Sequence, residues 1–142
     1  MTTSQSTFRG LANVSFFADD LDAARRWYTD VFGIEPYFAR DGYVEFRVGD
    51  DLDEIGIIDR RYAPGAGGPS GAVVSWHVDD LAGTFARLVE LGATVHDGIR
   101  ERGAGFVTAS VVDPFGNLLA VMTNPHWVEV TAAREALADR HA

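Results

Sequence analysis

Apolar residues recur along this chain at two spacings, one typical of helices and one typical of strands, and the same order of elements occurs twice. Helical spacing predicts a first helix that ends at Gly33 and a second that ends at Gly92. The apolar positions are Leu21, Ala24, Trp27, Tyr28, Val31 and Phe32 in the first helix, and Leu81, Phe85, Leu88 and Val89 in the second. A short apolar strand precedes each helix.

Three strand-like runs follow each predicted helix. They lie near residues 34–38, 43–48 and 54–59 in the first half, and at 94–97, 106–112 and 118–123 in the second. Each half is therefore predicted to be a βαβββ module, and the fold class to be α+β with a cupped mixed sheet.

Self-comparison supports the repeat, because residues 16–21 match residues 76–81 at an offset of 60. Each copy contains an Asp-Asp pair at the expected helix start, so we interpret these pairs as N-caps. The predicted domains are 8–62 for the first module, 63–71 for a Gly/Pro-rich linker, 72–127 for the second module, and 128–142 for an exposed helical tail that serves packing or a dimer edge. The linker is pliable enough to permit an exchange of halves between two chains, a route to a homodimer.

A tight turn joins the last two strands. Asp113 suits the first turn position, Pro114 presets φ at the second, and Gly116 suits the fourth. Apolar runs flank this turn on both sides, which predicts a β-hairpin.

Composition narrows the classes of function. A formal charge of −9 opposes binding to nucleic acid; it either attracts cationic ligands or only maintains solubility. The chain has no cysteine, so disulfides and thiolate chemistry are excluded. No apolar run reaches the roughly 18 residues of a membrane span, and the first residues lack signal-peptide features. We therefore expect a cytoplasmic protein with neither nucleic acid nor membrane as a partner.

Two βαβββ modules with Asp-Leu helix starts, the second ending in Asp-Pro-Phe-Gly-Asn at 113–117, resemble the vicinal oxygen chelate superfamily. This superfamily includes glyoxalase I, extradiol dioxygenases and the bleomycin resistance proteins. The resemblance covers residues 8–127. It implies that each module forms half of a cup, with a ligand cavity between the modules.

In metal-dependent members of that family, a His on the first strand and a Glu on the last strand of each module bind one divalent ion. Three of these positions hold Asn13, Val73 and Ala120 here. The fourth falls in 54–57, where Glu54 and Gly56 align equally well. Val and Ala have no donor atom, so we expect neither a metal nor another cofactor.

Strand alternation, with those positions defining the inward face, predicts a lining of small and apolar residues with a few hydrogen-bonding groups. The predicted lining is Asn13, Ser15 and Phe17; Val73, Ser75 and His77; Ala120 and Met122; and, if their shared face is the inner one, Thr108 and Ser110.

His77 is the first candidate for acid–base chemistry, with Glu54 as its partner. The alternative is a buried His that a neighbouring hydroxyl satisfies. His126 either lines the rim or lies in a surface loop, whereas His96 and His141 are assigned to a loop and the tail. Residues 100–106 form either a plain hairpin connection or a mobile cover that brings Glu101 or Arg102 to a polar ligand.

Two functions follow. The leading hypothesis is a dimer that binds a small amphipathic or aromatic molecule without a metal, as in antibiotic sequestration. The alternative is a glyoxalase-like lyase, isomerase or dioxygenase, with or without a divalent metal held by a set such as Glu54, His77 and His126. A purely structural module has no support beyond the C-terminal helix.

Overall fold

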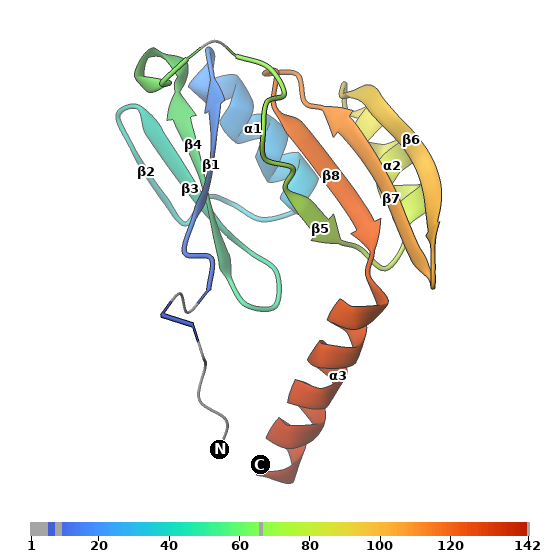
Figure 1. Ribbon diagram of the computed structural model, residues 1–142. Coiled ribbons are helices and arrows are strands. Elements are labelled where there is room, and N and C mark those ends of the chain that lie inside the picture. Colours follow the sequence, from blue (N-terminus) through green and yellow to red (C-terminus); the bar gives the residue numbers. More distant parts are fainter. Residues whose placement is uncertain (1–5, 8–9, 66, 142) are drawn as a thin grey trace. The chain divides into compact units, whose positions relative to one another are not determined.

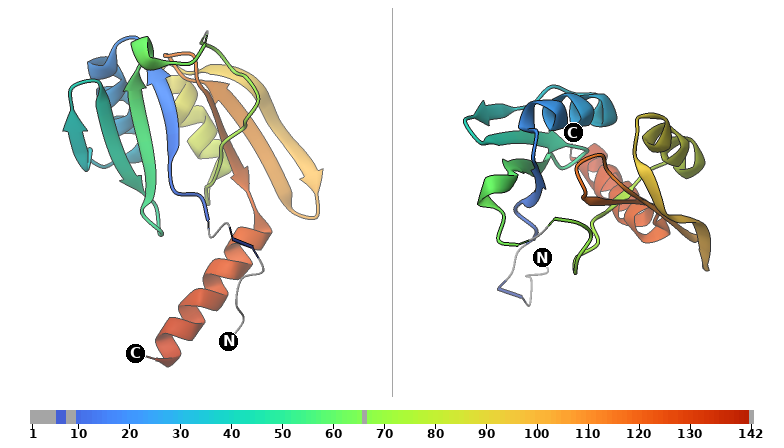
Figure 2. Two further views of the ribbon diagram at one scale, coloured as in Figure 1. Left: turned by 60° about the vertical axis from the view of Figure 1, so that its left-hand side comes forward. Right: turned by 90° about the horizontal axis from the view of Figure 1, so that it is seen from above.

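The computed structural model describes residues 6–7, 10–65 and 67–141, and the chain divides into two compact units, 1–67 and 68–142 (Figure 1). Each unit contains a four-stranded mixed sheet with a helix against one face (Figure 2). The order of elements in both units is βαβββ, so the predicted α+β fold of two tandem modules is confirmed.

The sheet of the first unit has the strand order β1-β4-β3-β2, with β1 parallel to β4 and the other pairs antiparallel. Its elements are β1 (Val14–Ala18), α1 (Leu21–Phe32), β2 (Phe38–Arg40), β3 (Tyr43–Val48), β4 (Asp53–Asp59) and the 3-10 turn η1 (Arg60–Tyr62). Alternate strand residues, among them Phe16, Phe46 and Ile57, are buried against α1, where Tyr28 is fully buried. This alternation leaves the opposite face of the sheet without a helix.

The second unit repeats this arrangement with the strand order β5-β8-β7-β6. Its elements are β5 (Ser75–His77), α2 (Leu81–Glu90), β6 (Thr94–Gly103), β7 (Phe106–Val112), β8 (Leu118–Thr123) and α3 (Pro125–Arg140). Val111, Leu119 and Val121 are buried on the face that carries α2, together with Leu88 from the helix. In both units we call the face turned away from the helix the open face.

Both Asp pairs provide helix caps, as predicted. The side chain of Asp20 accepts the backbone N–H of Ala23 at 3.0 Å, and that of Asp80 accepts the N–H of Gly83 at 3.0 Å. Gly33 follows α1 with a φ of 70°, a left-handed conformation that glycine adopts without steric cost.

Three predicted boundaries are wrong. No strand forms at 34–37, and β2 begins only at Phe38. Strand β6 continues to Gly103 instead of ending at residue 97, because β6 and β7 form one long hairpin. The C-terminal helix begins at Pro125 because Asn124 caps it, which places His126 in the first helical turn and not in a loop.

Helix α3 extends beyond the end of β8 and has no buried residue along its length (Figure 1). Within the part of the chain that the structure describes, none of the helices has the length and apolar character needed to cross a bilayer.

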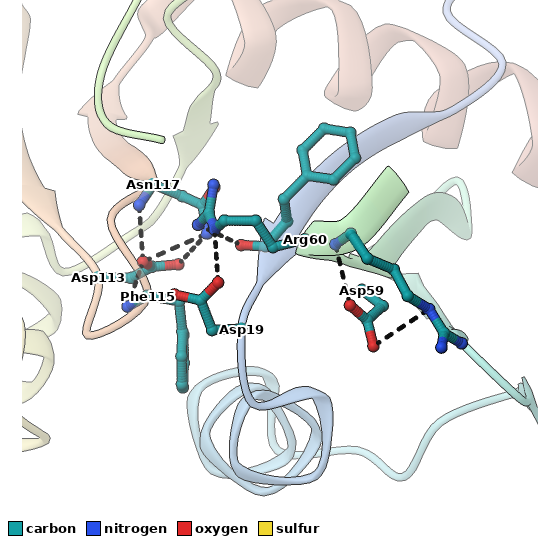
Figure 3. Close-up of polar contacts among 8 residues, drawn as sticks. Asp19, Asp59, Arg60, Asp113, Phe115 and Asn117 are labelled. Carbon is teal, nitrogen blue, oxygen red and sulfur yellow. Dashed lines mark hydrogen bonds and ion pairs between the residues drawn. The ribbon is translucent and has the colours of Figure 1, made fainter. Parts of the chain in front are cut away.

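The predicted turn between β7 and β8 is held by the carboxylate of Asp113, a residue that is 4% exposed (Figure 3). Its Oδ1 accepts the backbone N–H groups of Phe115 at 2.9 Å and Asn117 at 2.8 Å, and the Asn117 side-chain amide donates to Oδ2 at 3.0 Å. Gly116 donates its N–H to the Asp113 carbonyl at 3.2 Å and has a φ of 92°. The residue type at each turn position therefore matches its structural task.

Replacing Asp113 with Ala is expected to lower the free energy of unfolding by about 1–3 kcal/mol, because it leaves the N–H groups of Phe115 and Asn117 without their acceptor. Urea denaturation followed by far-UV circular dichroism measures this change. The control is Asp139→Ala, an exposed position on α3, for which we expect a change within about 0.5 kcal/mol. Equal stability of the two variants would contradict the assignment.

Candidate functional site

The open face of the second sheet contains a cavity of about 280 Å3. Apolar side chains form part of its wall, and hydroxyl, imidazole, carboxylate and guanidinium groups form the rest. The lining residues are Val73, Ser75, His96, Asp97, Arg102, Thr108, Ala109, Ser110, Leu118 and Ala120.

Strand register explains why these residues meet. Ser75 on β5 lies opposite Ala120 on β8, which lies opposite Ser110 on β7, which lies opposite Asp97 on β6. This row crosses all four strands on one face, because residues paired across a sheet point to the same side. The shared face of Thr108 and Ser110 is therefore the open one.

A β-bulge brings His96 into the cavity wall. Val95 pairs with Val111 and Asp97 with Ser110, so His96 is the extra residue between two consecutive pairs. Its Nδ1 lies 3.1 Å from the Ser110 hydroxyl. The assignment of His96 to a loop is therefore wrong: it belongs to β6 and contacts the site.

The arginines near the cavity are fixed by Asp97 and a threonine. Arg102 donates from Nε to the Thr108 hydroxyl at 2.9 Å and from Nη2 to Asp97 Oδ2 at 3.3 Å. Arg100 donates from Nε to Asp97 Oδ1 at 2.7 Å. The hydrogen bond from Arg100, reinforced by the charges of both arginines, holds the pKa of Asp97 below its usual value. Asp97 therefore stays ionised and orients both guanidinium groups.

Five of the predicted lining residues lie on this cavity: Val73, Ser75, Thr108, Ser110 and Ala120. His77 and Met122, which are paired on β5 and β8, are not among the described residues that line it. The sequence analysis assigned His96 to a loop and kept Arg102 only as an alternative, and it did not place Asp97, Ala109 or Leu118 on the lining. The three residues on β6 lie at or beside register shifts, which strand alternation does not anticipate.

His77 has partners at both ring nitrogens. Its Nδ1 accepts the backbone N–H of Asn124 at 3.1 Å, and its Nε2 lies 3.2 Å from Asp79 Oδ1. The ring stacks on Trp127 with a centroid separation of 4.5 Å and an interplanar angle of 14°. Because Nδ1 accepts, Nε2 carries the proton and donates it to Asp79. These contacts join β5 to the start of α3, which favours a structural role for His77.

The open face of the first sheet carries a chain of polar contacts. Ser15 donates to Asn13 Oδ1 at 2.7 Å, and Asn13 Nδ2 donates to Glu54 Oε1 at 2.8 Å. Phe17, two residues beyond Ser15 on β1, is half-buried, and its carbonyl accepts from Arg60 at 3.2 Å. Asn13, Ser15 and Glu54 are thus brought together in this unit.

Tyr43 lies across Gly56 on the same face. A Cβ atom at Gly56 would come within 2.8 Å of the Tyr43 ring, so only glycine leaves room for this arrangement. The Tyr43 hydroxyl donates to Glu45 Oε1 at 2.9 Å. Burial of the phenol, followed by the hydrogen bond to Glu45 and its charge, raises the pKa of Tyr43.

Register also resolves the fourth family metal position. Ser15 and Ser75 are repeat equivalents, 60 residues apart, and lie opposite Gly56 and Ala120 respectively. Gly56 is therefore the equivalent of Ala120, and Glu54 lies two residues away on β4. With Asn13 and Val73 at the other two positions, the side chains present do not fit a transition metal. The described residues also contain no group of three or more His, Asp or Glu that could hold a metal ion.

Residues 10–121 match the family model for the Glyoxalase/Bleomycin resistance protein/Dioxygenase superfamily. This protein therefore belongs to that superfamily, as its two modules and its Asp-Pro-x-Gly-Asn turn predicted. No curated protein matches the sequence.

Solved structures share the fold at low sequence identity. A lactoylglutathione lyase from Agrobacterium tumefaciens is 23% identical with a TM-score of 0.67, over 86% of this chain and 98% of its own. A glyoxalase-related enzyme from Fulvimarina pelagi is 20% identical with a TM-score of 0.67, over 83% and 90%. A superfamily member from Sphaerobacter thermophilus is 16% identical with a TM-score of 0.68, over 84% and 100%. At these identities the likeness shows the fold alone.

The raised pKa of Tyr43 predicts a loss of stability at alkaline pH. Its folded pKa exceeds the unfolded value of about 10, so its contribution is complete below pH 10 and is lost as pH rises through the folded pKa. The chain contains no lysine, so tyrosines dominate titration in this window. Tyr43→Phe is expected to reduce the fall in unfolding free energy between about pH 9 and pH 11.

Urea unfolding at a series of pH values measures this slope, and phenolate absorbance follows the titration directly. The control is Tyr62→Phe, which removes a tyrosine that is 61% exposed. If both variants lose stability as steeply as the unmodified protein, Tyr43 is not the group responsible.

Proposed function

We propose that this protein binds a small amphipathic or aromatic molecule in the cavity of the second unit, without a metal ion. Sequestration of such a molecule, an antibiotic being one class, is the role that this activity would serve. The cavity combines apolar walls with a few hydrogen-bonding groups, which is the usual composition of a small-molecule site.

One observation carries the proposal. Val73 and Ala120 occupy two family metal positions, and both contribute apolar surface to the wall of the cavity. Leu118 continues this surface along β8, because residues two apart on a strand share a face. A ligand would therefore meet a hydrophobic wall at these positions, where metal-dependent relatives carry ligating side chains.

Filling the cavity should weaken binding. Ala120→Leu adds three carbon atoms at the centre of the wall, and we expect it to reduce the affinity for indole or benzyl alcohol by about tenfold or more. Ligand-observed NMR and isothermal titration calorimetry measure the change. The control is Val95→Leu, an exposed position on β6 that is not among the described lining residues. Undiminished binding by Ala120→Leu would place the site elsewhere.

The second candidate is a glyoxalase-like lyase, isomerase or dioxygenase. Its support is the His96 imidazole on the cavity wall, oriented by Ser110, as a general base must be. His77 and Glu54 are the other acid–base candidates, and both have hydrogen-bond partners. A catalyst of this kind would use acid–base chemistry on a substrate held over the apolar wall.

Metal content tests the metal-independent proposal against a metal-dependent enzyme. After incubation with Zn2+, Ni2+, Mn2+ and Fe2+ in turn, followed by desalting, we expect far less than one ion per chain by plasma mass spectrometry. The reason is the lack of donor atoms at Val73, Ala120 and Gly56. A stoichiometric ion that survives desalting would overturn the metal-independent proposal and favour the enzyme.

A further inference from the structure

We propose that the cavity of the second unit selects ligands that carry a carboxylate, and that Arg102 is the residue that binds this group. The inference rests on the proposed function, since it assumes that the cavity takes a small molecule. It goes further by assigning the charge of the ligand, the end of the cavity that recognises it, and the side chain responsible.

The local charge of the cavity is opposite to that of the whole chain. The formal net charge is −9, but the only charged groups among the described lining residues are Asp97 and Arg102, with His96 beside them. Arg100 adds a second guanidinium through its bond to Asp97. The side chains at this end of the cavity are therefore two guanidinium groups and one carboxylate, which gives a net positive charge. Exposed charges farther away than about 8 Å are largely screened at physiological ionic strength, so this local balance decides selection.

The Asp97 carboxylate is already occupied. Its Oδ1 accepts from Arg100 at 2.7 Å and its Oδ2 from Arg102 at 3.3 Å. A cationic ligand would have to compete with both arginines for the single acidic group on the wall. The acidic composition of the chain therefore does not make this cavity a site for cations.

Arg102 retains donors for a ligand. A guanidinium has five N–H groups, and hydrogen bonds to Thr108 and Asp97 use two of them. Three N–H groups are left, on a side chain that is 51% exposed and held from two sides. Paired N–H groups of this kind match the two oxygens of a carboxylate, and the existing contacts reduce the entropy lost on binding.

The apolar part of the cavity wall and the cavity volume limit the size and polarity of the rest of the ligand. Val73, Leu118 and Ala120 offer apolar surface, and the Ser75 hydroxyl lies in the same row of paired residues as Ala120. A volume of about 280 Å3 falls near the lower end of small-molecule pockets, which start at about 300 Å3. A monocyclic or short-chain carboxylic acid, with its carboxylate at Arg102 and its apolar body over β8, meets these constraints.

Three monocyclic probes of similar size test the charge preference: benzoate, benzyl alcohol and benzylamine. Isothermal titration calorimetry at low and at physiological salt should give the order benzoate, benzyl alcohol, benzylamine, from tightest to weakest. We expect benzoate to bind about tenfold or more tighter than benzyl alcohol at low salt, and salt to reduce that advantage.

Arg102→Gln should weaken benzoate binding by about tenfold or more and leave benzyl alcohol within about twofold. The matched control is Arg87→Gln on α2, which makes the same charge change at an exposed arginine paired with Glu90. Arg102→Lys keeps the charge but not the paired N–H donors, so its affinity for benzoate should lie between those of the unmodified protein and Arg102→Gln. If Arg102→Gln has a lowered melting temperature, Arg102→Lys replaces it in the comparison.

The outcomes separate the two proposals. Benzylamine binding as tightly as benzoate, or equal benzoate affinity in Arg102→Gln and Arg87→Gln, would overturn the inference. If benzyl alcohol binds and Ala120→Leu blocks it while benzoate has no advantage, the binding function stands and only the carboxylate assignment falls. If none of the three probes binds, the proposed function falls and this inference falls with it.

Discussion

One helix can bury only one face of a four-stranded sheet, and this constraint shapes both units. Apolar residues such as Phe46 in the first sheet and Val111 in the second alternate with polar ones, and the apolar set lies on the face that carries the helix. The other face is then free to carry function. It holds a chain of hydrogen bonds through Asn13 and Glu54 in one unit, and a cavity beside Arg102 in the other. The two units thus bury equivalent apolar faces under their helices, whereas their open faces carry different groups.

Much of the fold could be predicted from the sequence because its signals are local. The Asp20 cap and the turn at Asp113 each depend on residues within four positions along the chain. The fourth family metal position could not be assigned from local sequence, since Glu54 and Gly56 aligned equally well. Only the pairing of Ser15 with Gly56 decided between them, and strand register is a long-range property that one sequence does not reveal.

The candidate site could be predicted only in part, for a related physical reason. Strand alternation placed Ser75 and Ala120 on one face, which is the face of the cavity, because β5 and β8 pair regularly; it left the face of Thr108 open. It gave no lining residue on β6, where the register shifts three times. His96 and Arg102 are therefore oriented by irregular backbone and not by a repeating pattern. Composition was also misleading, since an acidic chain places two arginines beside its cavity.

The bulge at His96 lies on an edge strand, and this position has an evolutionary consequence. An edge strand has a neighbour on one side only, so gaining or losing one residue there disturbs a single ladder of hydrogen bonds. Shortening β6 by one residue would restore regular pairing next to Ser110 and withdraw the imidazole, while the buried face under α2 kept its register. Insertions and deletions at this edge thus provide a route by which descendants of one scaffold acquire different chemistries.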